Sequence, residues 1–164
     1  MSSQQKLLLI TRFPYESILS GEEWHTITLS EELIKRGWTV AFLGSCNVLV
    51  QEFLRRKIMV RRMPRFAVPV SLWHLIGFFF LWPVQLVWMG LEVIHIQRYY
   101  GKKPSVMMLS LGEKIVLTPL LLLWKIPVVW MEHQRLGAWI YKNPLRWFYE
   151  KWPDFYLFQL GEDL

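Results

Sequence analysis

Residues 6–44 read KLLLITRFPYESILSGEEWHTITLSEELIKRGWTVAFLG, and this stretch decides the predicted fold. Lys6 to Thr11 and Thr39 to Gly44 are short apolar runs of the kind that form buried strands. Between them, Ser20-Gly21-Glu22-Glu23 has the S-x-x-E form of a helix capping box, and Gly37 stands where a helix commonly ends. A strand, a helix and a second strand in this order predict a parallel βαβ unit.

The rest of the chain repeats this alternation of short apolar runs and helical patterns. Further strands are predicted at Lys57 to Arg62, Glu92 to Gln97, Pro127 to Glu132 and Phe155 to Gln159. The 164 residues suffice for roughly one domain. The predicted fold is therefore an α/β, Rossmann-like, open and mostly parallel sheet with crossover helices, forming a single domain over residues 1–164.

Composition and charge narrow the class of partner. Apolar types make up 53% of the chain and aromatic types 16%, so the chain can bury a core. The formal net charge of +6 favours an anionic partner, such as a membrane surface, a phosphate-bearing substrate or a nucleic acid. Cys46 is the single cysteine, and the apolar run Leu7 to Ile10 is too short for a signal peptide. Both observations predict a cytoplasmic protein.

Residues 66–91 contain no charged side chain over 26 positions, which is long enough for a helix to span a bilayer. The segment also contains prolines and a glutamine, and a span would leave the strands before and after it on opposite sides of the membrane. We therefore favour a helix lying in the membrane interface, with Trp73, Trp82 and Trp88 at headgroup depth. A fully buried crossover helix and a true span are the alternatives.

Six of the eleven residues from Arg55 to Arg65 are basic, and they directly precede this apolar segment. A basic cluster beside an aromatic-rich helix forms a two-part anchor for an anionic leaflet. The residues expected to contact the membrane are the three tryptophans together with Arg55, Arg56, Arg61 and Arg62. A solvated sheet edge is the alternative for the cluster. Nucleic acid is not expected as a partner, because the aromatic residues are not interleaved with the basic ones.

Catalytic signatures are sparse. Asp154 and Asp163 are the only aspartates, so the chain offers no D-x-D clamp for a metal-bound diphosphate, and neither a metal site nor a cofactor is predicted. The glycine-rich dinucleotide loop, the P-loop and the G-x-S-x-G elbow are also missing. The remaining candidates lie at the carboxyl ends of predicted strands, where open α/β sheets bind their ligands.

Two such places carry candidate residues. The loop after the first strand leads to a helix N-terminus at Gly21, whose free N–H groups favour a phosphate or another anion. Glu132 and His133 follow the buried run Val128 to Met131, which places a carboxylate and an imidazole at the same edge. His133 is suited to general base or hydrogen-bonding work. A purely structural histidine is the alternative.

Several of these segments resemble the GT-B glycosyltransferases of family 4. Ser20 to His25, followed by Leu29 to Val40, is similar to the family's opening pattern G-G-x-E…L-A-E-E-L-x-x-R-G-H-E-V. Val93 to Gln97 resembles its D-V-I-H-x-H strand, and Ile126 to His133 resembles its G-I-P-V-V-x-T-x-H strand. The matches follow the family's order over nearly the whole chain.

The resemblance implies the N-terminal, acceptor-side half of a retaining enzyme. Such an enzyme transfers a sugar from a nucleotide sugar to a lipid-linked or glycan acceptor, here at the inner face of the membrane. The same resemblance implies that Gly21 lies near the donor phosphates and that His133 is the catalytic residue approaching the reacting sugar. The further residues implied to line the substrate cleft are Glu22, Trp24, His25 and Glu132.

The sequence also departs from the family pattern. Ser20 replaces the first of two glycines, Trp38 replaces a histidine, and Glu92 replaces an aspartate. The family's C-terminal half, with its E-x7-E motif for the nucleotide sugar, has no counterpart here, so transfer is expected to need a donor-binding domain or partner chain. The alternative is a non-catalytic, membrane-associated binding or scaffold protein that retains the fold.

Overall fold

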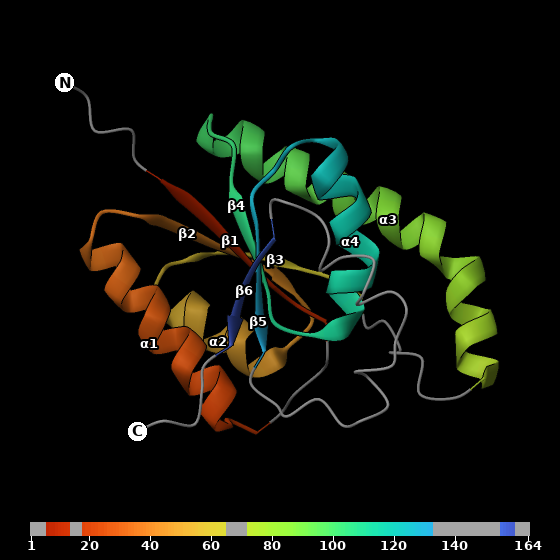
Figure 1. The fold of residues 1–164 in the computed structure, drawn as a ribbon. Helices are drawn as coiled ribbons and strands as arrows, with labels where there is room; N and C mark the ends of the chain where they lie inside the picture. The colour runs from red at the N-terminus through yellow and green to blue at the C-terminus, as the bar shows by residue number, and fades with distance from the viewer. Residues whose placement is uncertain (1–5, 14–17, 65–71, 133–154, 160–164) are drawn as a thin grey trace.

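The computed structural model describes residues 6–13, 18–64, 72–132 and 155–159, which form an open α/β fold (Figure 1). The elements in chain order are β1 (Leu7–Arg12), α1 (Gly21–Lys35), β2 (Thr39–Gly44), α2 (Asn47–Arg55), β3 (Met59–Arg62), α3 (Leu72–Tyr100), β4 (Ser105–Met108), α4 (Leu111–Leu123), β5 (Val128–Glu132) and β6 (Phe155–Gln159). The six strands pair in parallel in the order β3-β2-β1-β4-β5-β6. The predicted Rossmann-like α/β class is confirmed.

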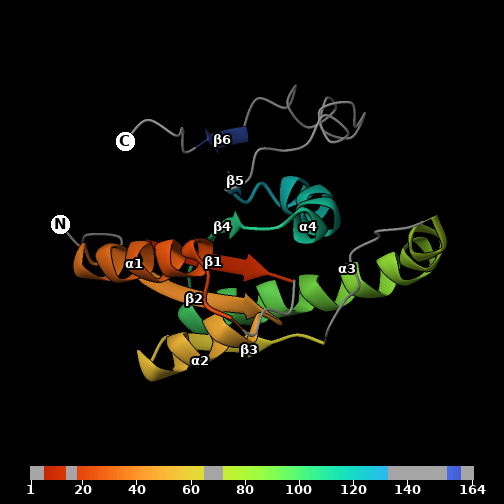
Figure 2. The same ribbon diagram turned by 90° about the horizontal axis from the view of Figure 1, so that it is seen from below.

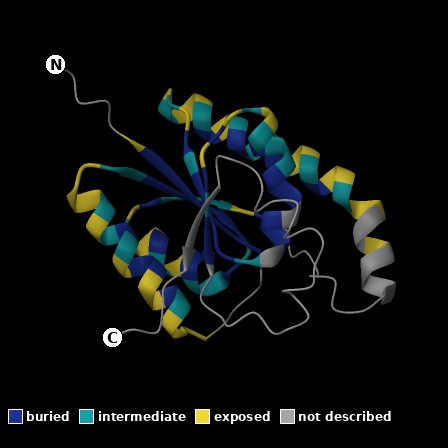
Figure 3. Ribbon diagram, viewed as in Figure 1, coloured by how far each residue is buried: buried dark blue, intermediate teal, exposed yellow. Residues whose placement is uncertain are grey.

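Hydrophobic clusters cover both faces of the sheet. The helices α1 and α2 pack on one face, through side chains such as Ile27 and Phe53. The helices α3 and α4 pack on the other face, through side chains such as Met89 and Leu117. Figure 2 shows the two helix pairs on opposite sides of the stacked strands, and Figure 3 shows the buried residues concentrated along them. Because helices cover both faces of the sheet, the loops that can form a site lie at the ends of the strands.

Both predicted ends of α1 are confirmed. Ser20 is the N-cap residue, and its backbone N–H donates to Oε2 of Glu23 at 3.0 Å in the predicted capping box. At the other end Gly37 has a φ of +82°. The N–H of Trp38 donates to the carbonyl of Leu33 at 3.0 Å, which completes a Schellman motif. Glycine suits this place because it enters the left-handed region without a Cβ clash.

The helices α2 and α4, which the sequence did not predict, end in the same motif but carry lysine at the glycine position. Lys57 has a φ of +58° and Lys125 a φ of +52°. The N–H of Ile58 donates to the carbonyl of Phe53 at 2.9 Å, and the corresponding bond at Ile126 is 2.8 Å long. A side chain in the left-handed region costs roughly 1–2 kcal/mol per residue, so both helix ends are held under strain.

The predicted strand at Glu92 to Gln97 is wrong, because these residues belong to α3. Met89, Val93 and Ile96 are all fully buried, and their spacing of four and three residues is that of one helix face. The three β-branched residues Val93, Ile94 and Ile96 within this short stretch imitated a strand. The fourth strand is instead β4, which was not predicted, and the similarity of Val93 to Gln97 to a family strand does not extend to the structure.

The apolar segment at 66–91 contributes to a crossover helix with two different sides. Helix α3 connects β3 to β4 and buries Gln85, Met89 and Val93. Within the described parts of the chain, no helix is both long and apolar enough to cross a bilayer. Trp82 is partly buried and packs against the core, which does not fit its predicted place at headgroup depth. Trp88 is exposed, and the side chain of Trp73 lies outside the described residues.

Candidate functional site

The sheet changes its direction of winding between β1 and β4. From β1 the chain builds outward through β2 to β3, and then α3 carries it back to β4 on the other side of β1. Open α/β sheets bind ligands outside the carboxyl ends of the strands at such a switch point. The N-termini of α1 and α4 follow β1 and β4, so both lie at this edge.

Arg12, the last residue of β1, forms a buried ion-pair cluster with the first turn of α1. Its guanidinium contacts the Glu22 carboxylate, and Nη2 lies 2.7 Å from Oε1 of Glu23. The side chains of Arg12 and Glu23 are 6% and 1% exposed. One positive and two negative charges leave the cluster with a formal charge of −1. The helix N-terminus therefore already holds two carboxylates, which use part of its attraction for negative charge.

The cluster also shifts the acid–base behaviour of its members. Burial by itself disfavours the charged form of Glu23, but the hydrogen bond from Ser20 and the charge of Arg12 outweigh it, so the pKa of Glu23 is lowered. Burial likewise disfavours the Arg12 cation, but the hydrogen bond and charge of Glu22 outweigh it, so the pKa of Arg12 is raised. Arg12 and Glu23 are therefore both charged at neutral pH.

Glu113 ties the carboxyl ends of β1 and β4 together from the first turn of α4. Its side chain is fully buried, and its two oxygens accept the N–H groups of Phe13 at 3.2 Å and Leu109 at 3.0 Å. Ser110, the N-cap residue of α4, donates its N–H to the same carboxylate at 2.6 Å. Burial raises the pKa of Glu113, although these hydrogen bonds oppose the shift. This one carboxylate thus adds a side-chain link between the ends of two strands that are already paired through their backbones.

Lys114, the next residue of α4, reaches the end of β5. Its side chain is buried, and Nζ donates to the carbonyl of Met131 at 2.9 Å. Nζ also lies 5.7 Å from the ring centroid of Trp130, within the range of a cation–π contact. A single helical turn therefore contacts the carboxyl ends of β1, β4 and β5.

Gly44 allows the ends of β1 and β2 to approach each other closely. A Cβ at this position would lie 2.2 Å from the carbonyl oxygen of Arg12, a backbone atom that cannot rotate away. Next to it, the N–H of Ser45 donates to the same carbonyl at 3.1 Å. Only glycine fits here without displacing the strand that carries Arg12.

The structure brings most of the predicted site residues to this edge. Gly21, Glu22, Trp24 and His25 all lie in the first turns of α1, and the backbone of Glu132 ends β5. Trp24 is 57% exposed, and a Cβ at Gly21 would meet nothing within 4 Å, so the space outside this turn is open. His133 lies outside the described residues.

The structure does not bring the basic residues of the predicted membrane anchor onto one surface. These residues are Arg55, Arg56, Arg61 and Arg62. Arg56 contacts Glu31 of α1 at 2.5 Å, so it lies with α1 and α2 on one face of the sheet. Arg61 makes two hydrogen bonds, of 2.7 and 3.0 Å, to Glu92 of α3 on the other face. Folding therefore divides a cluster that is continuous in the sequence.

Three residues of the edge were missed by the sequence analysis: Arg12, Glu113 and Lys114. Glu23 was predicted as a capping residue but not as a partner of Arg12. A signal existed for Glu113, because Ser110-Leu111-Gly112-Glu113 has the same S-x-x-E form as the start of α1. Arg12 and Lys114 carried no such signal. Their importance depends on burial against partners that are distant in the sequence.

Comparisons with known proteins agree with this fold. No protein-family model matches the chain, and no curated protein matches it. Among solved structures, the chain is similar to a glycosyltransferase from Rickettsia africae ESF-5, with a TM-score of 0.62 and 16% sequence identity. The similarity covers 90% of this chain and 34% of that one. The chain thus spans about a third of the length of the glycosyltransferase whose fold it shares.

The class of protein follows from these findings. The chain is a Rossmann-like α/β protein with a glycosyltransferase-like fold and a topological switch point between β1 and β4. Among the described residues, no group of three or more His, Cys, Asp or Glu side chains is arranged to hold a metal ion.

Proposed function

We propose that this chain is the acceptor-side half of a retaining, nucleotide-sugar-dependent glycosyltransferase of the GT-B type, similar to family 4. It acts at a membrane surface on a lipid-linked or glycan acceptor, and a donor-binding half completes it. The observation that carries the proposal is the similarity of fold to a glycosyltransferase over 90% of this chain but only 34% of that one. The family-like motifs at Ser20 to Val40 and at Ile126 to His133 support it independently.

The proposed roles follow the carboxyl edge of the sheet. His133 acts on the reacting sugar, while Trp24, His25 and Glu132 line the acceptor cleft. Gly21 lies next to the donor phosphates, at the exposed start of α1. Glu22 lies in the same turn, but its carboxylate contacts Arg12, so we assign it to shaping the helix start as well as to lining the cleft.

The test is to restore the missing half. The purified chain is mixed with a donor-binding domain that carries the E-x7-E motif, and transfer from labelled nucleotide sugars to lipid extracts is measured. Transfer is expected only in the mixture. In that mixture His133→Ala is expected to lower kcat by about 10²- to 10⁴-fold, the range of a general base or positioning role. Wild-type turnover by the variant would remove His133 from the mechanism.

A second candidate is a non-catalytic binding or scaffold protein that keeps the fold. The observation that favours it is the formal charge of −1 on the cluster of Arg12, Glu22 and Glu23, which opposes a diphosphate at the start of α1. Calorimetric titration of nucleotide sugars into the donor-binding domain, with and without this chain, separates the two candidates. An affinity that the chain leaves unchanged, together with absence of transfer, would favour the scaffold.

A further inference from the structure

The outward side of α3 is apolar, and it packs neither on the sheet nor at the carboxyl edge where β1 and β4 end. We call this surface the α3 apolar face; its residues and their exposed fractions are Phe80 81%, Leu81 56%, Val84 61%, Val87 62%, Trp88 45% and Leu91 61%. Six large apolar side chains exposed together on one helix form a contiguous patch, which on a soluble surface marks an interaction site.

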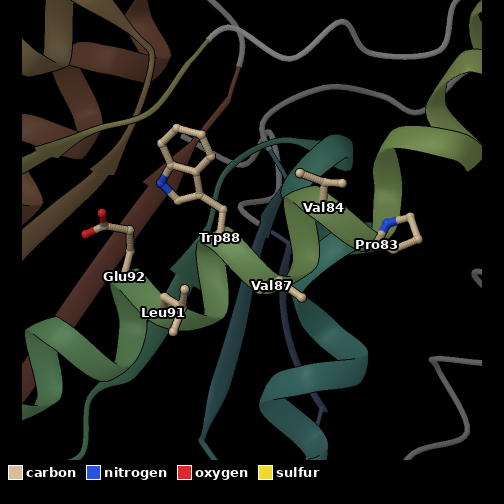
Figure 4. Close-up of a pocket in the computed structure, with 6 residues that line it drawn as sticks. All are labelled: Pro83, Val84, Val87, Trp88, Leu91 and Glu92. Carbon is tan, nitrogen blue, oxygen red and sulfur yellow. The ribbon is translucent and has the colours of Figure 1, made fainter.

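The α3 apolar face lies opposite the side that packs on the sheet. Phe80, Val84, Val87 and Leu91 follow one another at spacings of four, three and four residues, which keeps them on one stripe of the helix. Pro83, Val84, Val87, Trp88, Leu91 and Glu92 line an open groove of about 590 Å³ (Figure 4). Among the lining residues that the structure describes, Glu92 is the one that carries a charge.

The charges around the face are positive or neutralised. Glu92 is held by the two hydrogen bonds from Arg61, so its carboxylate is compensated. Arg98 is exposed on the same stripe, seven residues after Leu91. In the sequence, the next charged residues after Glu92 are all basic until Glu113: Arg98, Lys102 and Lys103. An apolar stripe that ends in the exposed Arg98 is complementary to an anionic interface.

We propose that the α3 apolar face docks on an anionic lipid bilayer, with α3 lying in the plane of the interface. A helix satisfies its backbone hydrogen bonds internally, so the face can enter the acyl boundary without burying unpaired polar groups. The groove admits acyl chains between Val84, Val87 and Leu91, while Arg98 contacts headgroup phosphates. Arg55 and Arg56 take no part, because Arg56 lies on the opposite side of the sheet.

This inference specifies the membrane part of the proposed function, and it can be tested without any sugar transfer. The full chain is incubated with phosphatidylcholine vesicles, with and without phosphatidylglycerol, and the bound fraction is measured by flotation at low and high salt. Binding is expected to require phosphatidylglycerol and to weaken with salt, since charges are screened over roughly 8 Å at physiological ionic strength. Neither donor nor acceptor is present, so loss of transfer and loss of docking are distinguishable.

Paired variants locate the contact. Val87→Gln with Leu91→Gln is expected to weaken vesicle partitioning at least about tenfold, because apolar area is lost from the buried face. The matched control is Ile34→Gln with Leu54→Gln, which removes two side chains 42% and 51% exposed elsewhere, and should leave partitioning unchanged. Arg98→Gln is expected to weaken it about fivefold, from about 1 kcal/mol per basic residue near the surface, whereas Arg55→Gln should have no effect.

A fluorescent label gives a second, site-specific measurement. Cys46 is fully buried, so Val87→Cys provides the reactive thiol, and Leu54→Cys is the control. An environment-sensitive probe at position 87 is expected to shift to the blue with anionic vesicles, and the probe at position 54 is not. Unchanged emission at position 87, or undiminished flotation of the glutamine pair, would overturn the proposal. So would concentration-dependent dimerisation, without vesicle binding, that the same pair abolishes, because the occupant would then be a second copy of the chain.

Discussion

At Gly44 the ends of β1 and β2 lie so close together that a side chain has no room. Gly44→Ala would place a Cβ 2.2 Å from the Arg12 carbonyl oxygen. We expect it to lower the free energy of unfolding by about 1–3 kcal/mol, the usual cost of overpacking, measured by urea denaturation. Gly21→Ala is the control, since its Cβ meets nothing within 4 Å. Equal stability of the two variants would contradict this account.

Glu23 makes the stability of the chain depend on pH. Its pKa is lowered in the folded state, so its contribution is fully present above the unfolded-state pKa and is lost as the pH falls through the lowered folded-state pKa. Glu23→Gln is therefore expected to destabilise by about 1.5–3 kcal/mol at neutral pH, the range for hydrogen bonds to charged groups, and by progressively less in acid. Denaturation curves across the acidic range measure the difference.

The control for Glu23 is Glu32, an exposed carboxylate of the same helix whose side chain is 48% exposed. Its ion pair with Arg36 is an i,i+4 pair on the surface, and such pairs contribute about 0.3–0.5 kcal/mol. Glu32→Gln should accordingly show little loss at any pH. A Glu23→Gln variant whose deficit persisted unchanged into acid would show that packing, and not charge, explains its effect.

Among the secondary-structure elements, α2 and α4 carry strain at their ends. Lys57→Gly is expected to raise the free energy of unfolding by about 1 kcal/mol, because glycine enters the left-handed region without a Cβ clash. Lys57→Ala removes the same charge and keeps the clash, so it should bring no gain. Guanidinium denaturation of the three proteins checks the order. Equal stability of the glycine and alanine variants would mean that the charge of Lys57, and not its φ of +58°, governs this position.

The sequence predicted those elements whose signals are local. The capping box at Ser20, the glycine at Gly37 and the buried runs that became β1, β2 and β5 all sit within a few residues of the structure they form. The prediction of the fourth strand was wrong because the local signals were misleading. Ser105–Met108 is only four residues long and contains two methionines, which favour strands weakly, while Val93 to Ile96 carries β-branched residues that a long helix absorbed.

The candidate site was predicted less completely than the fold. Its place at the carboxyl edge followed from the rule that open α/β sheets bind ligands at the carboxyl ends of their strands, and Gly21, Glu22 and Glu132 do lie there. Glu113 accepts a hydrogen bond from Phe13, which is 100 positions away in the sequence. Lys114 donates one to Met131, which is 17 positions away. No local pattern encodes contacts of that separation.

If the chain has the proposed function, the described sheet and helices form one wall of a cleft whose other wall is the donor-binding half. A nucleotide sugar needs its base, ribose and diphosphate held together for productive positioning. The chain by itself should therefore bind nucleotide sugars weakly or undetectably in calorimetric titration and should not turn them over. Tight binding and unaided turnover by the purified chain would contradict the need for a donor-binding half.

The first turn of α4 limits which residues of this protein can vary during evolution. Because Glu113 connects the ends of β1 and β4 to this turn and Lys114 connects the end of β5 to it, a substitution of either residue disturbs the carboxyl edge. Descendants that acquire a new ligand are thus expected to vary in the outward-facing residues of α1, such as Trp24, while keeping this pair. Side chains at this carboxyl edge are therefore expected to change more readily than the arrangement of the strand ends.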